Sequence, residues 1–152
     1  ISFGVESGNQ RILDSMRKGT TVADIKKVLS ESHRAGMTNI VFIMFGFPGE
    51  NESSLMDTVN FLRDNLEDID IVSASVFGLQ RGSKVYDNPS EFGVFGIREH
   101  DTTFGESIGY KVRTGLSEKQ AKVMKENLAK ELRAMNKLPN IFCLLKEQTL
   151  LF

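Results

Sequence analysis

Residues that could bind a ligand follow each of the three strands that the sequence predicts. Glu6 and Ser7 follow the first strand, residues 44–50 (Met-Phe-Gly-Phe-Pro-Gly-Glu) end the second, and residues 78–83 follow the third. The carboxyl ends of parallel strands meet at one edge of a sheet, where ligands bind in parallel α/β proteins. A carboxylate such as that of Glu6 accepts hydrogen bonds from hydroxyl or ammonium groups. We therefore expect a ligand site at this edge, although any parallel α/β domain would gather its strand ends in this way.

Patterns for several other chemistries are missing from the sequence. It contains no Ser-His-Asp order, no Walker loop and no Gly-x-Gly-x-x-Gly motif. His33 and His100 have no cysteine or carboxylate around them at metal-ligand spacing, so we predict no metal site from these residues. Cys143 is the single cysteine, which argues against a disulfide framework and favours a reducing, cytoplasmic location.

The elements that must position the strand-end residues alternate between strand and helix. Strands are predicted over residues 1–5, 40–45 and 69–77, and the unbroken apolar run over 40–45 predicts a strand buried on both faces. Helical patterns occupy residues 9–17, the segment after Thr21 and the segment after Asn51. Strand–helix–strand order at these spacings predicts right-handed βαβ units with parallel pairing.

The second half of the chain has weaker patterns. Residues 78–115 contain seven glycines and scattered phenylalanines, which predicts a long loop with short strands at most. Ser117 and Gln120 have capping-box spacing at the start of a last amphipathic helix, which Pro139 ends. Residues 140–152 form a largely apolar tail, which we expect to be buried against another surface.

Composition sets broad limits. The chain has 152 residues, 40% hydrophobic and 26% charged, which predicts a single globular unit. A net charge of -1 gives no indication of nucleic acid or an anionic membrane as a partner. No apolar run approaches the roughly 20 residues that span a bilayer. The chain starts at Ile1, within a predicted strand, so we expect it to be a piece of a longer protein.

Three motifs together resemble one enzyme family. They are Phe-Gly-Val-Glu-Ser-Gly from residue 3, Ile-Leu-Asp-Ser-Met-Arg-Lys-Gly from residue 12 and Phe-Gly-Phe-Pro-Gly-Glu from residue 45. Over about residues 1–86, the chain resembles the second half of the core barrel of radical S-adenosylmethionine (radical SAM) enzymes, especially members that carry a cobalamin-binding domain. The resemblance implies an α/β fold, a partial (β/α) barrel of three or so parallel strands with flanking helices. Residues 87–152 would form a C-terminal helical extension.

The resemblance also implies which residues bind S-adenosylmethionine. Glu6 matches a position near the ribose or the methionine end, and Ser7 belongs to the same motif. Lys18 matches a basic position that pairs with the methionine carboxylate. Met44 matches an apolar residue that packs on adenine, and Gly46 would let the backbone approach closely.

Simpler roles exist for the same side chains. Glu6 could favour the start of the following helix through the helix dipole, and Lys18 could be a solvated charge at a helix end. Met44 could be a core residue. Glu50 is expected to serve the start of the next helix. Arg81 could meet an anion, but we expect it to be solvated.

The family's three-cysteine loop, which binds the [4Fe–4S] cluster, is absent from this sequence. The resemblance therefore implies that the cluster ligands lie outside this chain, which alone would be inactive and bind S-adenosylmethionine weakly or not at all. The intact enzyme would cleave S-adenosylmethionine to a 5′-deoxyadenosyl radical that acts on an unidentified small-molecule or other substrate. The resemblance to members with a cobalamin-binding domain suggests cobalamin as a further cofactor.

Two other functions fit the same elements. The chain could be a non-catalytic α/β module that binds a nucleotide-type ligand, or a structural assembly domain. The outer strands of a three-stranded sheet have open edges, and the apolar tail needs cover. We therefore predict that the isolated chain forms a homodimer or a larger assembly.

Overall fold

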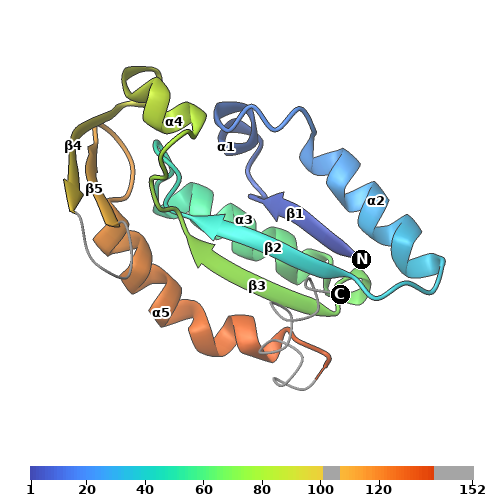
Figure 1. The fold of residues 1–152 in the computed structure, drawn as a ribbon. Coiled ribbons are helices and arrows are strands. Elements are labelled where there is room, and N and C mark those ends of the chain that lie inside the picture. Colours follow the sequence, from blue (N-terminus) through green and yellow to red (C-terminus); the bar gives the residue numbers. More distant parts are fainter. Residues whose placement is uncertain (101–106, 139–152) are drawn as a thin grey trace.

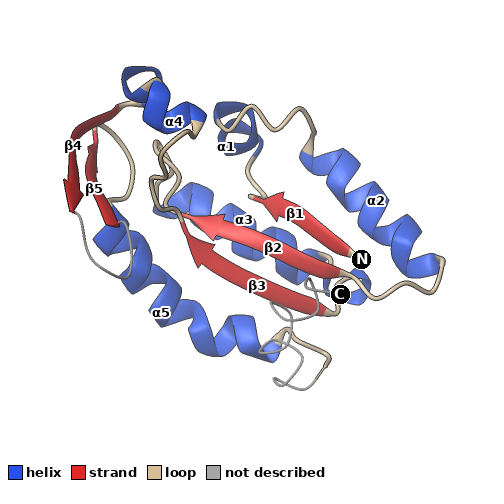
Figure 2. Cartoon of the chain, viewed as in Figure 1, coloured by secondary structure: helices blue, strands red, loops and turns tan. Residues whose placement is uncertain are grey.

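The structure, a computed structural model, describes residues 1–100 and 107–138 (Figures 1 and 2). Pro139, Cys143 and the apolar tail over residues 140–152 lie outside these described residues. The elements in chain order are β1 (Ser2–Glu6), α1 (Gln10–Ser15), α2 (Val22–Arg34), β2 (Ile40–Phe45), α3 (Glu52–Asp64), the 3-10 turn η1 (Leu66–Asp68), β3 (Ile71–Val76), α4 (Lys84–Asp87), the 3-10 turn η2 (Pro89–Phe92), β4 (Val94–His100), β5 (Ser107–Val112) and α5 (Glu118–Ala134).

The first three strands form one parallel sheet in the order β1-β2-β3. Ser2 pairs with Ile40, and Ile40 pairs with Ile71, so the amino ends of the strands are aligned. Each connection contains helix, as parallel pairing requires. The predicted α/β class, with parallel strands and flanking helices, is confirmed.

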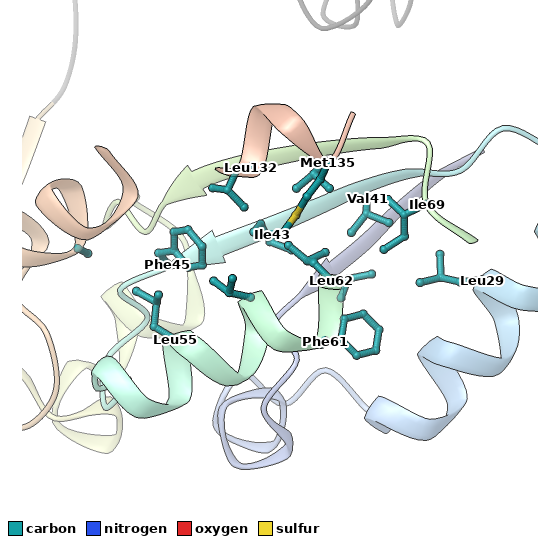
Figure 3. Packing of buried hydrophobic residues seen from close by; sticks show 14 of the residues in the cluster. Leu29, Val41, Ile43, Phe45, Leu55, Phe61, Leu62, Ile69, Leu132 and Met135 are labelled. Atoms are coloured by element: carbon teal, nitrogen blue, oxygen red, sulfur yellow. The ribbon is translucent and has the colours of Figure 1, made fainter. Parts of the chain in front are cut away.

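One face of the sheet carries the main hydrophobic core (Figure 3). Val41, Ile43 and Phe45 of β2 are at most 1% exposed and share this core with side chains of α2, α3 and α5. In Figure 1, α3 lies behind the sheet, on this face. Burying each such side chain stabilises the fold by about 2 kcal/mol.

The opposite face of β2 is only half-buried, which differs from the prediction of burial on both faces. Ile40, Phe42 and Met44 alternate with the three core residues and keep intermediate exposure. The alternation follows from the pleat of the strand, because the helices that build the main core lie on one side only. In Figure 1 no described helix passes in front of this face.

A second core lies at the carboxyl end of the sheet. Its buried members come from α1, from the segments that follow β2 and β3, and from α4, β4 and β5: Ile12, Phe47, Phe77, Leu79, Val85, Val94 and Ile108. The ring of Phe47 meets that of Phe77 edge-on, with centroids 5.3 Å apart. This cluster covers the end of the sheet where the strand tips gather.

Residues 78–115 contain more regular structure than predicted. They include α4, η2 and an antiparallel pair, β4 with β5, whose register shifts between Phe95 and Arg98. Gly96 lies within this irregularity at φ 61°. Glycines and a register shift interrupt the alternation by which a strand is recognised in a sequence, and this explains the difference.

The last helix belongs to the main core. Ser117 and Gln120 form the predicted capping box, which is confirmed. Ala121, Leu132 and Met135 are buried in the same core as β2. The predicted boundary between residues 86 and 87 stays a prediction, since side chains from both sides of it share this core. Within the described residues, no helix combines the length and the apolar character needed to cross a bilayer.

Candidate functional site

The three predicted strand ends lie at the same edge of the sheet. The arrowheads of β1, β2 and β3 point in one direction in Figure 1, as the parallel pairing of both strand pairs requires. Glu6 and Met44 are at or next to the carboxyl ends of their strands. The structure therefore brings together the segments that the sequence selected as a ligand site.

Glu6 ends β1 in an unusual backbone conformation. Its φ angle is 65°, in the left-handed region, and the register with β2 shifts between Gly4 and Glu6. A residue other than glycine costs about 1–2 kcal/mol in this conformation. Backbone strain of this kind is concentrated at functional sites, where contacts of the side chain offset its energetic cost.

The Glu6 carboxylate and the Lys18 ammonium lie over Gly4. Lys18 Nζ is 3.4 Å from Glu6 Oε1, and the two side chains are 35% and 24% exposed. A Cβ atom on Gly4 would lie 2.9 Å from Glu6 Oε1 and 3.3 Å from Lys18 Nζ. Because Gly4 has no side chain, the ion pair of Glu6 and Lys18 fits at the edge of β1 and stays accessible to solvent.

The end of α1 brings Lys18 to this position. Arg17 follows the helix at φ 57°, and the Lys18 N–H donates to the carbonyl of Leu13 at 3.1 Å. This reversal ends the helix in the manner of a Schellman turn, in which glycine usually takes the left-handed position. The chain then turns back toward β1, and the Lys18 side chain reaches Glu6.

Ser7 is fully buried and engaged in hydrogen bonds. Its Oγ lies 3.1 Å from Thr58 Oγ1 in α3 and accepts a hydrogen bond from the Asn9 N–H at 3.1 Å. The Gly8 N–H donates to the same threonine oxygen at 2.9 Å. Ser7 therefore fixes the loop between β1 and α1 against α3, directly beside Glu6.

Met44 and Gly46 lie at the end of β2. Met44 is half-buried and packs against the second core, opposite Ser75 in the register of the sheet. Gly46 has φ 80°, and a Cβ atom there would lie 2.5 Å from the Cβ of Ala121. The close approach that only glycine allows at this position is toward α5.

Glu50 has a role that the sequence did not reveal. Its side chain is fully buried, and Oε2 accepts a hydrogen bond from the Gly46 N–H at 2.5 Å. Oε1 is buried and has no hydrogen-bond partner among the described residues. The expected role at the start of α3 is wrong, because Asn51 caps that helix and Glu50 closes the turn over residues 46–49.

Burial determines the charge of Glu50. It raises the pKa of this carboxyl from 4.5 to about 7, against the opposing effects of the Gly46 hydrogen bond and the positive charge of Arg11. Its backbone carbonyl also accepts from the Leu116 N–H at 2.6 Å. Glu50 therefore links the turn after β2 to the segment before α5.

The segment after β3 is held by side chains from the hairpin. Arg81 is exposed, as expected for a solvated residue, and also pairs with Glu99 at 2.6 Å, to which the Tyr86 hydroxyl donates as well. The Tyr110 hydroxyl donates to the carbonyl of Phe77 at 3.1 Å, and burial raises the pKa of Tyr110. These contacts fix the third strand end in place.

Across residues 1–100 and 107–138, no group of three or more histidine, cysteine, aspartate or glutamate side chains could hold a metal ion. His33 is exposed on α2, as expected for a surface residue. The paired Glu6 and Lys18 are suited to a ligand that carries both an ammonium or hydroxyl group and a carboxylate.

The first part of the chain is similar in sequence to a known enzyme family. The sequence model of the radical SAM superfamily matches residues 1–62. A ribosomal protein uS12 methylthiotransferase from Protochlamydia amoebophila is 30% identical over 95 residues, which is 60% of this chain and 19% of that protein. A tRNA-2-methylthio-N(6)-dimethylallyladenosine synthase from Vibrio cholerae is 30% identical over 94 residues, again 60% and 19% of the two chains.

An uncharacterized protein from Methanocaldococcus jannaschii is 29% identical over 85 residues, which is 56% of this chain and 26% of that protein. The matched part of the chain thus spans no more than 26% of the length of these relatives.

Proposed function

We propose, from the match of the radical SAM superfamily model to residues 1–62, that this chain is part of a radical SAM enzyme and supplies part of its S-adenosylmethionine-binding surface. S-adenosylmethionine, bound beside a reduced [4Fe–4S] cluster, supplies radical chemistry on an organic substrate. The contribution of this chain is to bind and orient the methionine and adenosyl parts of the cofactor.

The observation that carries the proposal is the ion pair over Gly4. The methionine end of S-adenosylmethionine has one ammonium and one carboxylate group. Lys18 would pair with that carboxylate, and Glu6 would accept from the ammonium or from the ribose hydroxyls. Their separation of 3.4 Å and partial exposure support this role, because both groups can turn toward a ligand without leaving a buried charge behind.

The other predicted site residues take supporting parts in the proposal. Met44 would offer its half-buried side chain to the adenine ring. Ser7 and Gly46 would hold the two loops between which the cofactor lies, Ser7 through Thr58 and Gly46 through its contact with α5. For Ser7, whose side chain is fully buried, this role replaces direct contact with the ligand.

The described residues do not fit the [4Fe–4S] cluster, since no three of their side chains could hold a metal together. In our proposal the cluster is held by another part of the protein, and the chain alone is inactive. The names of the matched relatives do not refer to cobalamin, so the proposal does not include it.

Methylthio transfer is the reaction subtype to test first, because two of the relatives carry that activity in their names. The substrate is a separate question, since the match covers only 19% of each relative. We place the intact enzyme in the cytoplasm, where a reduced cluster would be stable. A non-catalytic binding module or an assembly domain remains the alternative, and loss of activity on changing Glu6 or Lys18 separates an enzyme from both.

The test is a kinetic comparison in the intact protein that contains this chain. Lys18→Met and Glu6→Gln are expected to raise the KM for S-adenosylmethionine about tenfold or more, as loss of a charge-assisted contact does, with unchanged thermal stability. Lys26→Met, on the exposed side of α2, is the matched control. If both site variants cleave S-adenosylmethionine with the kinetics of the control, the assignment of Glu6 and Lys18 is wrong.

A further inference from the structure

A hollow of about 550 Å³ lies beside the sheet edge that holds Glu6 and Lys18, which we call the cofactor edge. Several of the residues that line the hollow are charged. It is formed by α1, the turn after β2, η2 and the segment after β5. None of the five predicted cofactor-binding residues lines it. We propose that this hollow binds the phosphate group of a sugar phosphate or nucleotide, which makes it a second ligand site.

Three arginines from separate parts of the chain line the hollow. Arg11 comes from α1, Arg17 follows that helix, and Arg113 follows β5. Guanidinium groups bind phosphate through paired, charge-assisted hydrogen bonds. Three of them around one hollow, two from α1 and the residues after it and one from the segment after β5, form a surface suited to a phosphate dianion.

Two of these arginines have no carboxylate partner among the described residues. Arg11 donates to the carbonyl of Gly49 with both terminal nitrogens, each at 3.2 Å, and this neutral partner leaves the guanidinium its full charge. The exposed Arg113 side chain has no ion pair or hydrogen bond with any described residue. The hollow therefore presents two cations that a phosphate could neutralise.

Arg17 is held in place at a cost. Its left-handed backbone, at φ 57°, disfavours any residue but glycine by about 1–2 kcal/mol. Its guanidinium pairs with Glu91 at 2.5 Å and lies 5.3 Å from the centre of the Phe92 ring. The ion pair with Glu91 and the contact with the Phe92 ring hold the Arg17 guanidinium at the wall of the hollow.

The remaining lining residues favour a phosphorylated organic ligand over a free anion. Asp14 and Glu91 are hydrogen-bond acceptors, as the hydroxyl groups of a sugar require. The volume lies within the range of about 300–1,000 Å³ that is typical of small-molecule sites. The ligand that fits is therefore a phosphate monoester with a hydroxylated body.

The test is a titration of the chain, followed by the backbone amide signals of Gly93 and Thr114 in NMR spectra. Ribose 5-phosphate is the probe, ribose its neutral counterpart, and inorganic phosphate the free anion. Ribose hydroxyls could also reach Glu6 at the proposed cofactor edge, so the result is taken from the Gly93 and Thr114 amides, which line the hollow. Arg113→Gln is the variant, and Arg34→Gln, on the exposed end of α2, is the matched control.

We expect ribose 5-phosphate to bind about tenfold or more tightly than ribose, and Arg113→Gln but not Arg34→Gln to weaken it about fivefold or more. Equal binding of ribose and ribose 5-phosphate, or equal effects of the two variants, would overturn the proposal. So would inorganic phosphate binding as tightly as ribose 5-phosphate, because the organic part would then contribute nothing. None of these three results changes the assignment of Glu6 and Lys18.

Discussion

A Cβ atom on Gly46 would lie 2.5 Å from the Cβ of Ala121, so the turn after β2 and the start of α5 fit together only with glycine at residue 46. We predict that Gly46→Ala destabilises the chain by about 2–4 kcal/mol, from its left-handed φ of 80° and from the collision with Ala121. Urea unfolding followed by circular dichroism measures this loss.

Gly36→Ala provides the matched control for that variant. Gly36 has φ 78°, almost the same as Gly46, but no atom within 4 Å of a Cβ placed there. This variant is expected to lose only the backbone contribution, about 1–2 kcal/mol. Equal losses in the two alanine variants would show that the contact between Gly46 and Ala121 does not matter for stability.

Glu50 should make the stability of the chain depend on pH. Its pKa is about 7 in the folded chain and 4.5 when unperturbed. Between these values the folded state binds the proton and the unfolded state does not, so stability falls as pH rises through this window and levels off above about 7. The full difference amounts to roughly 3 kcal/mol.

Glu50→Gln removes this titration and resembles the protonated acid, because its amide oxygen can still accept from the Gly46 N–H. We expect the unfolding free energy of the variant to change by roughly 3 kcal/mol less than that of the parent chain between about pH 5 and pH 8. Denaturant midpoints at several pH values measure it. Parallel pH curves for the two proteins would contradict the assignment to Glu50.

Ser7 and Thr58 should act as one unit in stability. Their hydroxyl oxygens lie 3.1 Å apart, and each also accepts from a backbone N–H of the loop after β1. Ser7→Ala and Thr58→Val are each expected to cost about 1–3 kcal/mol, because each leaves a buried backbone donor without its partner. In a double-mutant cycle the two losses should add to more than the double variant shows, and strict additivity would argue against the coupling.

The sequence predicted the parallel sheet and the gathering of its strand ends, because apolar runs and helical periodicity are local signals. It could also select Glu6 and Lys18 through the family motifs. It could not predict that their side chains meet over Gly4, since that contact depends on a left-handed backbone at Glu6. A glutamate in that conformation has no local sequence signal.

The role of Glu50 and the partner of Arg81 were missed for a related reason. Each is fixed by partners that only the folded chain brings near: Glu50 by the turn after β2 and by Leu116, and Arg81 by Glu99 on β4. Charged residues are rarely fully buried, so position alone did not reveal that Glu50 is, whereas Arg81 is exposed as expected. Burial of a carboxylate becomes visible only with the second half of the chain in place.

The isolated chain is predicted to self-associate. Among the described residues, β2 is the only strand that pairs with β1, so the other edge of β1 has backbone groups available for pairing. Light scattering coupled to size exclusion is expected to give the mass of a dimer or a larger assembly. A monomer at all concentrations would contradict this prediction.

The most direct test of the central claim is an NMR titration of the 152-residue chain with S-adenosylmethionine. We expect weak binding, with signal changes confined to Glu6, Lys18, Met44 and their neighbours at the strand ends, and with most of the effect lost in Lys18→Met but kept in Lys26→Met. Signal changes at other residues in place of these, or the same changes in Lys18→Met, would contradict the assignment of the cofactor to this edge of the sheet.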